Sequence, residues 1–62
     1  MTNLILKPNL ADADEVYAEL LAAHDNLSPE DSTALNARLI LILANHIGDV
    51  DVIRQALIAA KT

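Results

Sequence analysis

The sequence predicts an all-α protein, a compact arrangement of three helices preceded by an extended N-terminal lead-in. Apolar residues recur at helical spacing in three segments, and start and stop signals separate the second and third of these. The chain has 62 residues, which is enough for one domain spanning 1–62. It contains no Cys, so disulfides and Cys-based zinc or redox sites are excluded. A domain this small therefore depends on good packing or on a partner.

Residues 1–8 are expected to be extended, because Pro8 disfavours helix at the preceding residue. The aliphatic residues 4–6 would lie across a helix pair or form a short strand. The first helix is expected over about 12–25, with Asp12 or Asn9 as its cap. Its apolar residues fall on one arc at about 100° per residue, and they are Ala13, Val16, Tyr17, Leu20, Leu21, Ala23 and His24.

The second helix is expected over 29–47 and the third over 50–61. Ser28 is a cap residue followed by Pro29 at the first helical position, a common start signal. Gly48 is suited to a left-handed stop, and Asp49 can cap the next helix. The third helix has an ordinary apolar stripe.

The second helix is apolar on nearly two faces. A broad face carries large residues, namely Leu35, Leu39, Ile40, Ile42, Leu43 and Ile47. A second seam of mostly small residues has spacing 3, 4, 3, 4, and it comprises Ala34, Ala37, Leu41 and Ala44, followed by Gly48. A helix that is apolar on nearly all sides is buried. Either the other helices and the lead-in cover both faces, or part of this surface is an interface with another chain. The second alternative is favoured, since exposed apolar patches usually mark an interface.

Polar residues on this helix are candidates for the same interface. Asn36 projects at the edge of the large face, where it would need a hydrogen-bonding partner and could fix helix register. Arg38 is expected to pair with Asp31 or with an acidic residue of the first helix. Asn45 lies on the narrow polar stripe.

The composition excludes several function classes. The net charge is −5 without a basic patch, which argues against binding to nucleic acid or an anionic membrane. The N-terminus resembles no signal peptide, and no apolar run is long enough to span a membrane. A cytoplasmic location is expected.

No motif indicates catalysis, so the chain is expected to be non-enzymatic and without a cofactor. A single Gly rules out a phosphate-binding loop, and no G-x-S-x-G is present. His24 and His46 lie at the ends of two helices without a second ligand at helical spacing, so no metal site is predicted. A small-ligand or metal-binding protein using these two histidines, across a dimer, is the alternative function.

The run from Leu35 to Asp49 resembles a family of short bacterial proteins, domain of unknown function 2783. Pro8-Asn9-Leu10, Tyr17 and Ala23-His24 add to the resemblance, and the matching motif residues are Asn36, Arg38, Asn45, His46 and Asp49. The resemblance implies a small protein without an assigned activity, associated with flavin-dependent oxidoreductases. The expected function is thus a helical interaction protein, either a homo-oligomer or an accessory subunit of a larger, flavin-dependent system.

Overall fold

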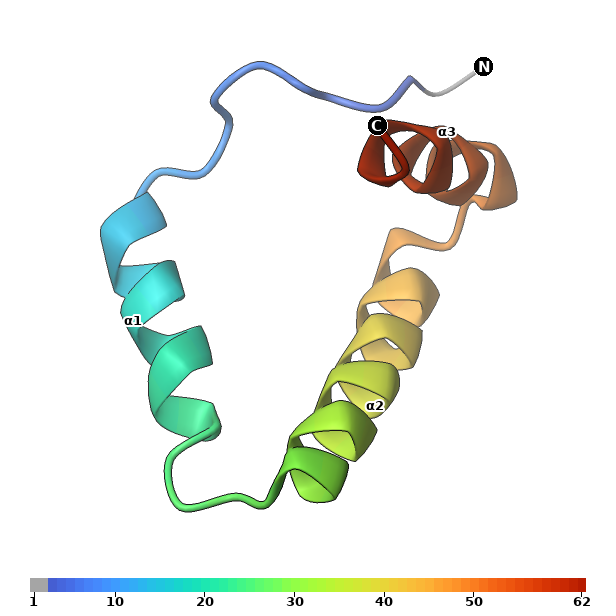
Figure 1. Ribbon diagram of the computed structural model, residues 1–62. Helices are drawn as coiled ribbons and strands as arrows, with labels where there is room; N and C mark the ends of the chain where they lie inside the picture. Colours follow the sequence, from blue (N-terminus) through green and yellow to red (C-terminus); the bar gives the residue numbers. More distant parts are fainter. Residues whose placement is uncertain (1–2) are drawn as a thin grey trace.

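The computed structural model describes residues 3–62 and contains three α-helices (Figure 1). They are α1 (Ala13–Ala23), α2 (Pro29–Ile47) and α3 (Val50–Ala60). Residues 3–12 form a lead-in without regular secondary structure, and no strand occurs in the described part of the chain. The predicted all-α class and the three helices are confirmed. The first two residues of the expected lead-in lie outside the described residues.

The ends of α2 and α3 follow from local chemistry. The Ser28 side chain accepts a hydrogen bond of 3.1 Å from the backbone N–H of Asp31, which satisfies one of the free amides at the start of α2. Gly48 adopts a left-handed conformation with φ 68° and ends α2. Asp49 then caps α3, accepting hydrogen bonds of 2.9 and 3.2 Å from the N–H groups of Asp51 and Val52.

The limits of α1 are less well fixed by side chains. Asp12 occupies the N-cap position, but its side chain makes no capping hydrogen bond, so it is a cap by position only. The helix ends at Ala23, two residues earlier than expected, and residues 24–26 form a turn. Asn26 is left-handed with φ 62°, a conformation that Asn tolerates better than most residues. A left-handed residue cannot continue a helix.

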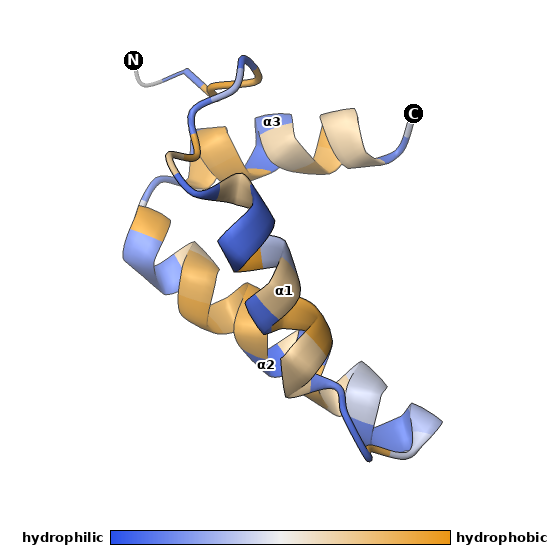
Figure 2. Cartoon of the chain, turned by 90° about the vertical axis from the view of Figure 1, so that its left-hand side faces the viewer, coloured by the Kyte–Doolittle hydropathy of each residue, from blue (hydrophilic) through white to orange (hydrophobic). Residues whose placement is uncertain are grey.

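The helices form an open frame. α1 and α2 diverge from the turn that joins them, and no Cα atom of one lies within 8 Å of a Cα atom of the other (Figure 1). α3 crosses the end of α2 at a steep angle, and the lead-in runs from α3 back to the start of α1. The view in Figure 2 shows α3 lying across one end of the frame, with most of the orange, hydrophobic ribbon on α2 and α3.

The arrangement is more open than the compact one that the sequence predicts. The radius of gyration is 13.4 Å, whereas a compact domain of this length has about 10.6 Å. Val52 is the only buried residue among residues 3–62. The physical reason is that no Cα atom of α1 lies within 8 Å of a Cα atom of another helix, so its apolar arc is at most loosely packed.

Candidate interaction surface

The best-formed tertiary contact is the corner where α3 crosses the end of α2. One side of α2 meets one side of α3 there, and Leu4 of the lead-in covers part of the junction. The result is an open apolar groove of about 280 Å³, lined by Leu4, Ile40, Leu43, Ala44, Ile47, Val52, Ile53, Ala56, Leu57 and Ala60. The backbone N–H of Leu4 donates a hydrogen bond of 3.1 Å to Oε1 of Gln55, which holds the lead-in at this corner.

A hydrogen bond at the turn shows which sides of α1 and α2 face each other. Nδ1 of His24 and Oγ of Ser32 are 3.0 Å apart, so the two residues point inward across the turn. Residues three and four positions away along each helix share that direction. We call these two stripes the inner faces; they comprise Ala13, Val16, Tyr17 and Leu20 on α1 with His24 directly after it, and Ser32, Leu35, Leu39, Ile42 and His46 on α2.

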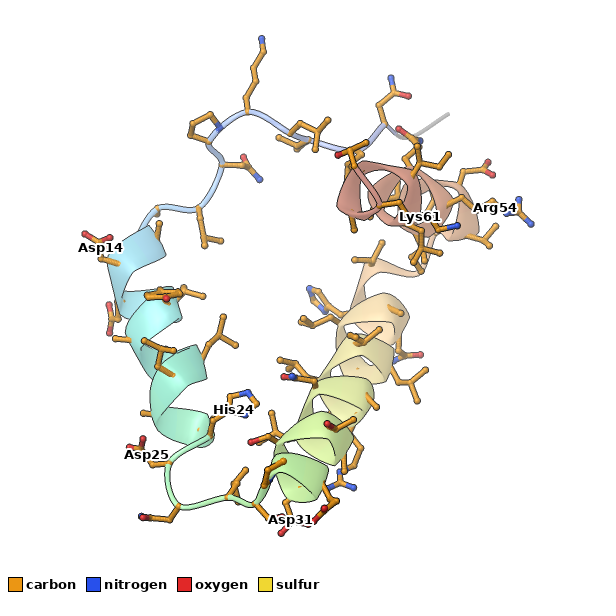
Figure 3. All side chains as sticks on the ribbon, viewed as in Figure 1. Asp14, His24, Asp25, Asp31, Arg54 and Lys61 are labelled. Carbon is orange, nitrogen blue, oxygen red and sulfur yellow. The ribbon has the colours of Figure 1, made fainter. Side chains whose placement is uncertain are left out.

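The inner faces are mostly apolar and only partly covered, since Val16, Leu35 and Leu39 are half-buried while other members stay exposed. Tyr17 and Ile42 are each 64% exposed, and Leu20 is also exposed. Neither stripe contains Asp, Glu, Lys or Arg. In contrast, Asp14 and Asp25 point away from α2, and Arg54 points outward from α3 (Figure 3). These three charged groups therefore lie on the outside of the frame, while its inside presents mostly apolar side chains that the chain covers only in part.

The structure divides the seam that was predicted as an interface. Ala44 lies in the groove at the corner, where α3 partly covers it. Ala34 is half-buried, whereas Ala37 is exposed and Leu41 is 70% exposed. The middle of the seam is thus available for contact with another chain, but one of its four members already belongs to an intramolecular contact. The seam remains a prediction.

The polar candidates on α2 make few contacts. Asn36, Arg38, Asn45 and His46 are all exposed. The predicted ion pair of Arg38 is not formed; within residues 3–62 the ion pair lies on α3, where Nη1 of Arg54 is 3.3 Å from Oδ1 of Asp51. Asn36 makes no side-chain hydrogen bond within the same residues, and its exposed amide can be hydrated.

The two histidines are far apart along the frame. His24 is half-buried beside Ser32 at the turn, whereas His46 is in the last turn of α2, near the corner. No group of three or more potential metal ligands (His, Cys, Asp or Glu) occurs among the described residues. One copy of the chain therefore does not bring His24 and His46 to a common site.

The large residues of α2 are predicted as one broad face. Their spacing also separates them into two stripes, a signal that this prediction missed. Ile40, Leu43, Ala44 and Ile47 follow the spacing i, i+3, i+4, i+7 and share the groove with α3. Ser32, Leu35, Leu39 and Ile42 follow the spacing 3, 4, 3 and form the inner face. The broad face of large residues is thus two adjacent stripes, one of which lines the groove with α3 while the other faces the α1 side of the frame.

The fold and its surface define a class of small helical chain with an incomplete core. Comparison with protein families matches residues 4–62 to the protein family of unknown function DUF2783. The chain belongs to this family, as its resemblance indicates. No curated protein and no solved structure matches the chain.

A helix that spans a membrane needs about 20 mostly apolar residues, and the three helices have 11, 19 and 11 residues. Among the described residues, none of the three is both long enough and apolar enough to cross a bilayer.

Proposed function

We propose that this chain is a non-enzymatic interaction protein whose helices bury their apolar surface against another protein chain. The observation that supports the proposal is the scarcity of buried side chains. Fifteen large hydrophobic residues are exposed, against one buried residue in the described part of the chain. An interaction role requires a protein partner but no cavity lined by catalytic groups.

The energetic argument rests on what a small fold needs. Ordering each residue costs about 1–2 kcal/mol of backbone entropy. Apolar burial offsets this cost at about 25 cal/mol per Å². A chain in which Val52 is the buried residue among residues 3–62 gains little free energy from apolar burial. An interface is therefore needed to complete the core. The partner is either a second copy or a larger subunit, such as the flavin-dependent oxidoreductase that the resemblance implies.

Light scattering and thermal melting test the proposal together. We expect the isolated protein either to be an oligomer or to melt without cooperativity, because neither outcome requires a core within one chain. A monomer that unfolds in one sharp, concentration-independent transition would contradict the proposal. Affinity capture from the native cell, with partners identified by mass, then separates self-association from binding to a larger subunit.

A further inference from the structure

We propose that the partner is a second copy of this chain, and that the inner faces of α1 and α2 from two copies pack together as the core of a two-fold symmetric four-helix bundle. This inference rests on the proposed function and specifies the partner and the surface.

The accessible surface of the chain indicates how much area a partner must cover. It is 5571 Å², whereas a folded monomer of 6.7 kDa exposes about 3,900 Å². The excess is about 1,700 Å² per chain, or about 3,300 Å² for two chains. Obligate homodimers bury about 2,000–5,000 Å² in total. The excess for two copies falls within this range; it belongs to the whole chain, and the inner faces supply part of it through Tyr17, Leu20 and Ile42.

The wide separation of α1 and α2, the two arms of the frame, favours helices of another chain packing between them over direct packing of α1 on α2. Helices in direct contact have axes about 8–10 Å apart, which brings some Cα atoms of the pair within 8 Å. α1 and α2 do not approach this closely. The His24–Ser32 hydrogen bond joins the two helices at the turn, and the Leu4–Gln55 hydrogen bond ties the lead-in, which continues into α1, to the corner. Figure 1 shows the two arms held open between these two ends.

Two-fold symmetry suits a surface of this kind. In a two-fold interface the same patch occurs on both chains and must complement itself. The inner faces are mostly apolar stripes with heptad-type spacing, the pattern that packs four helices around a common core. Each α1–α2 pair contributes two helices joined by a short turn, and two such pairs make four.

The charge distribution is compatible with self-association despite the net charge of −5 on each copy. Asp14 and Asp25 point away from the inner side of the frame, so the acidic groups of two copies would stay in water (Figure 3). The inner faces carry no fixed charge that would select a partner of opposite sign. Recognition by these faces is thus a matter of apolar shape, which a second copy can satisfy.

Two neighbouring residues of α2 provide a matched test. Ile42 lies on the inner face and Leu41 on the opposite seam, and they are 64% and 70% exposed within one chain. We expect the wild type to be a dimer by light scattering, with a melting midpoint that rises by about 5 °C for a tenfold increase in concentration. Ile42→Asp should weaken dimerisation about a thousandfold, because each dimer carries the change twice. Leu41→Asp should leave the mass unchanged.

The other outcomes separate this inference from the proposed function. A wild-type dimer that Leu41→Asp dissociates, while Ile42→Asp does not, would place the interface on the seam and overturn the inference alone. A wild-type monomer without a cooperative transition would also overturn it, leaving a larger subunit as the partner. A stably folded monomer would overturn both proposals.

Cross-linking keeps the test decisive if Ile42→Asp fails to fold. The chain has no Cys, so a variant with Val16→Cys and Leu39→Cys carries only the two thiols introduced on the inner faces. A short thiol cross-linker should join two chains and double the mass on a denaturing gel. A cross-link within one chain, or none beyond that of an outward control with Ala18→Cys and Leu41→Cys, would overturn the inference.

Discussion

The α2–α3 corner and the α1–α2 arms are both joined by short turns, yet only at the corner do Cα atoms of two helices come within 8 Å of each other. At the corner, Asp49 caps α3 with two hydrogen bonds and Val52 is buried against the groove. In the arms, the His24–Ser32 hydrogen bond acts at the turn alone, and the apolar stripes beyond it diverge. The difference teaches that a short turn between two amphipathic helices does not suffice for packing.

What distinguishes the two regions is the direction in which each turn sends the chain. At the corner, left-handed Gly48 and extended Asp49 turn α3 back across the last two turns of α2. At the arms, the turn through Asn26 leads into extended Ser28, and α2 leaves at an angle to α1. Burial follows at the corner because the third element, Leu4, also arrives there.

The largest effect is expected from Val52→Asp, which places a charge in the only buried position that the described residues offer. An unpaired charge there should cost at least about 3 kcal/mol and separate α3 from α2. Circular dichroism and amide hydrogen exchange of α3 measure the loss. Val50→Asp is the matched control, since Val50 is exposed in the first turn of α3, where an acid is favoured, and its effect should stay within about 0.5 kcal/mol.

The two left-handed residues allow the turns themselves to be compared. Gly48→Ala should lower the free energy of unfolding by about 1–2 kcal/mol through backbone strain. An added Cβ would meet the carbonyl oxygen of Asn45 at 3.7 Å, an ordinary contact, so no steric clash contributes. Asn26→Gly should change the free energy of unfolding by less than about 0.5 kcal/mol, since Gly accepts the same conformation. Equal effects in chemical denaturation would show that the two turns are equally constrained.

Loss of the N-cap of α3 should lower the free energy of unfolding by about 1 kcal/mol. Asp49→Ala removes the acceptor of two backbone N–H groups at the start of the helix. Asp51→Ala removes the exposed ion pair with Arg54, which should contribute at most about 0.5 kcal/mol. Thermal melts of the two variants, at matched protein concentration, compare them directly. A larger loss for Asp51→Ala would mean that the cap does not hold the corner.

A smaller effect is expected for the link between the arms. Ser32→Ala removes the hydrogen bond to His24, and Thr33→Ala removes the exposed bond from its hydroxyl to the carbonyl of Pro29. Both gain similar helix propensity, so their difference isolates the His24 contact. We expect Ser32→Ala to be the less stable by about 0.5 kcal/mol in urea denaturation. No difference would mean that the arms are unconnected beyond the backbone of the turn.

Zinc should have no effect on either region. A metal site filled at 100 times its dissociation constant would stabilise the fold by about 2.7 kcal/mol. The described residues contain no group of three or more potential metal ligands, so the melting midpoint should be the same with zinc and with a chelator. A zinc-dependent rise in the midpoint, abolished by His24→Ala and His46→Ala, would instead support the metal-binding alternative across two chains.

Helix limits were predictable where a single residue decides them. The limits of α2 match the expected ones, because Ser28 and Pro29 fix its start and left-handed Gly48 fixes its end. α3 likewise begins after Asp49 as expected and ends one residue before the expected limit. α1 is shorter than expected at both ends, because Asp12 forms no side-chain cap and the turn at Asn26 begins early.

The sequence by itself determined the all-α class, the turns and the excess of apolar surface, because capping, backbone conformation and helical spacing are local properties. Only the tertiary structure decided which stripe of α2 meets α3, which faces inward, and which stays on the seam. These depend on the angles between helices, and Ile40 and Ile42 are equally apolar in the sequence. One lines the groove with α3 and the other lies on the inner face, each 64% exposed, and only the position of the neighbouring helices distinguishes them.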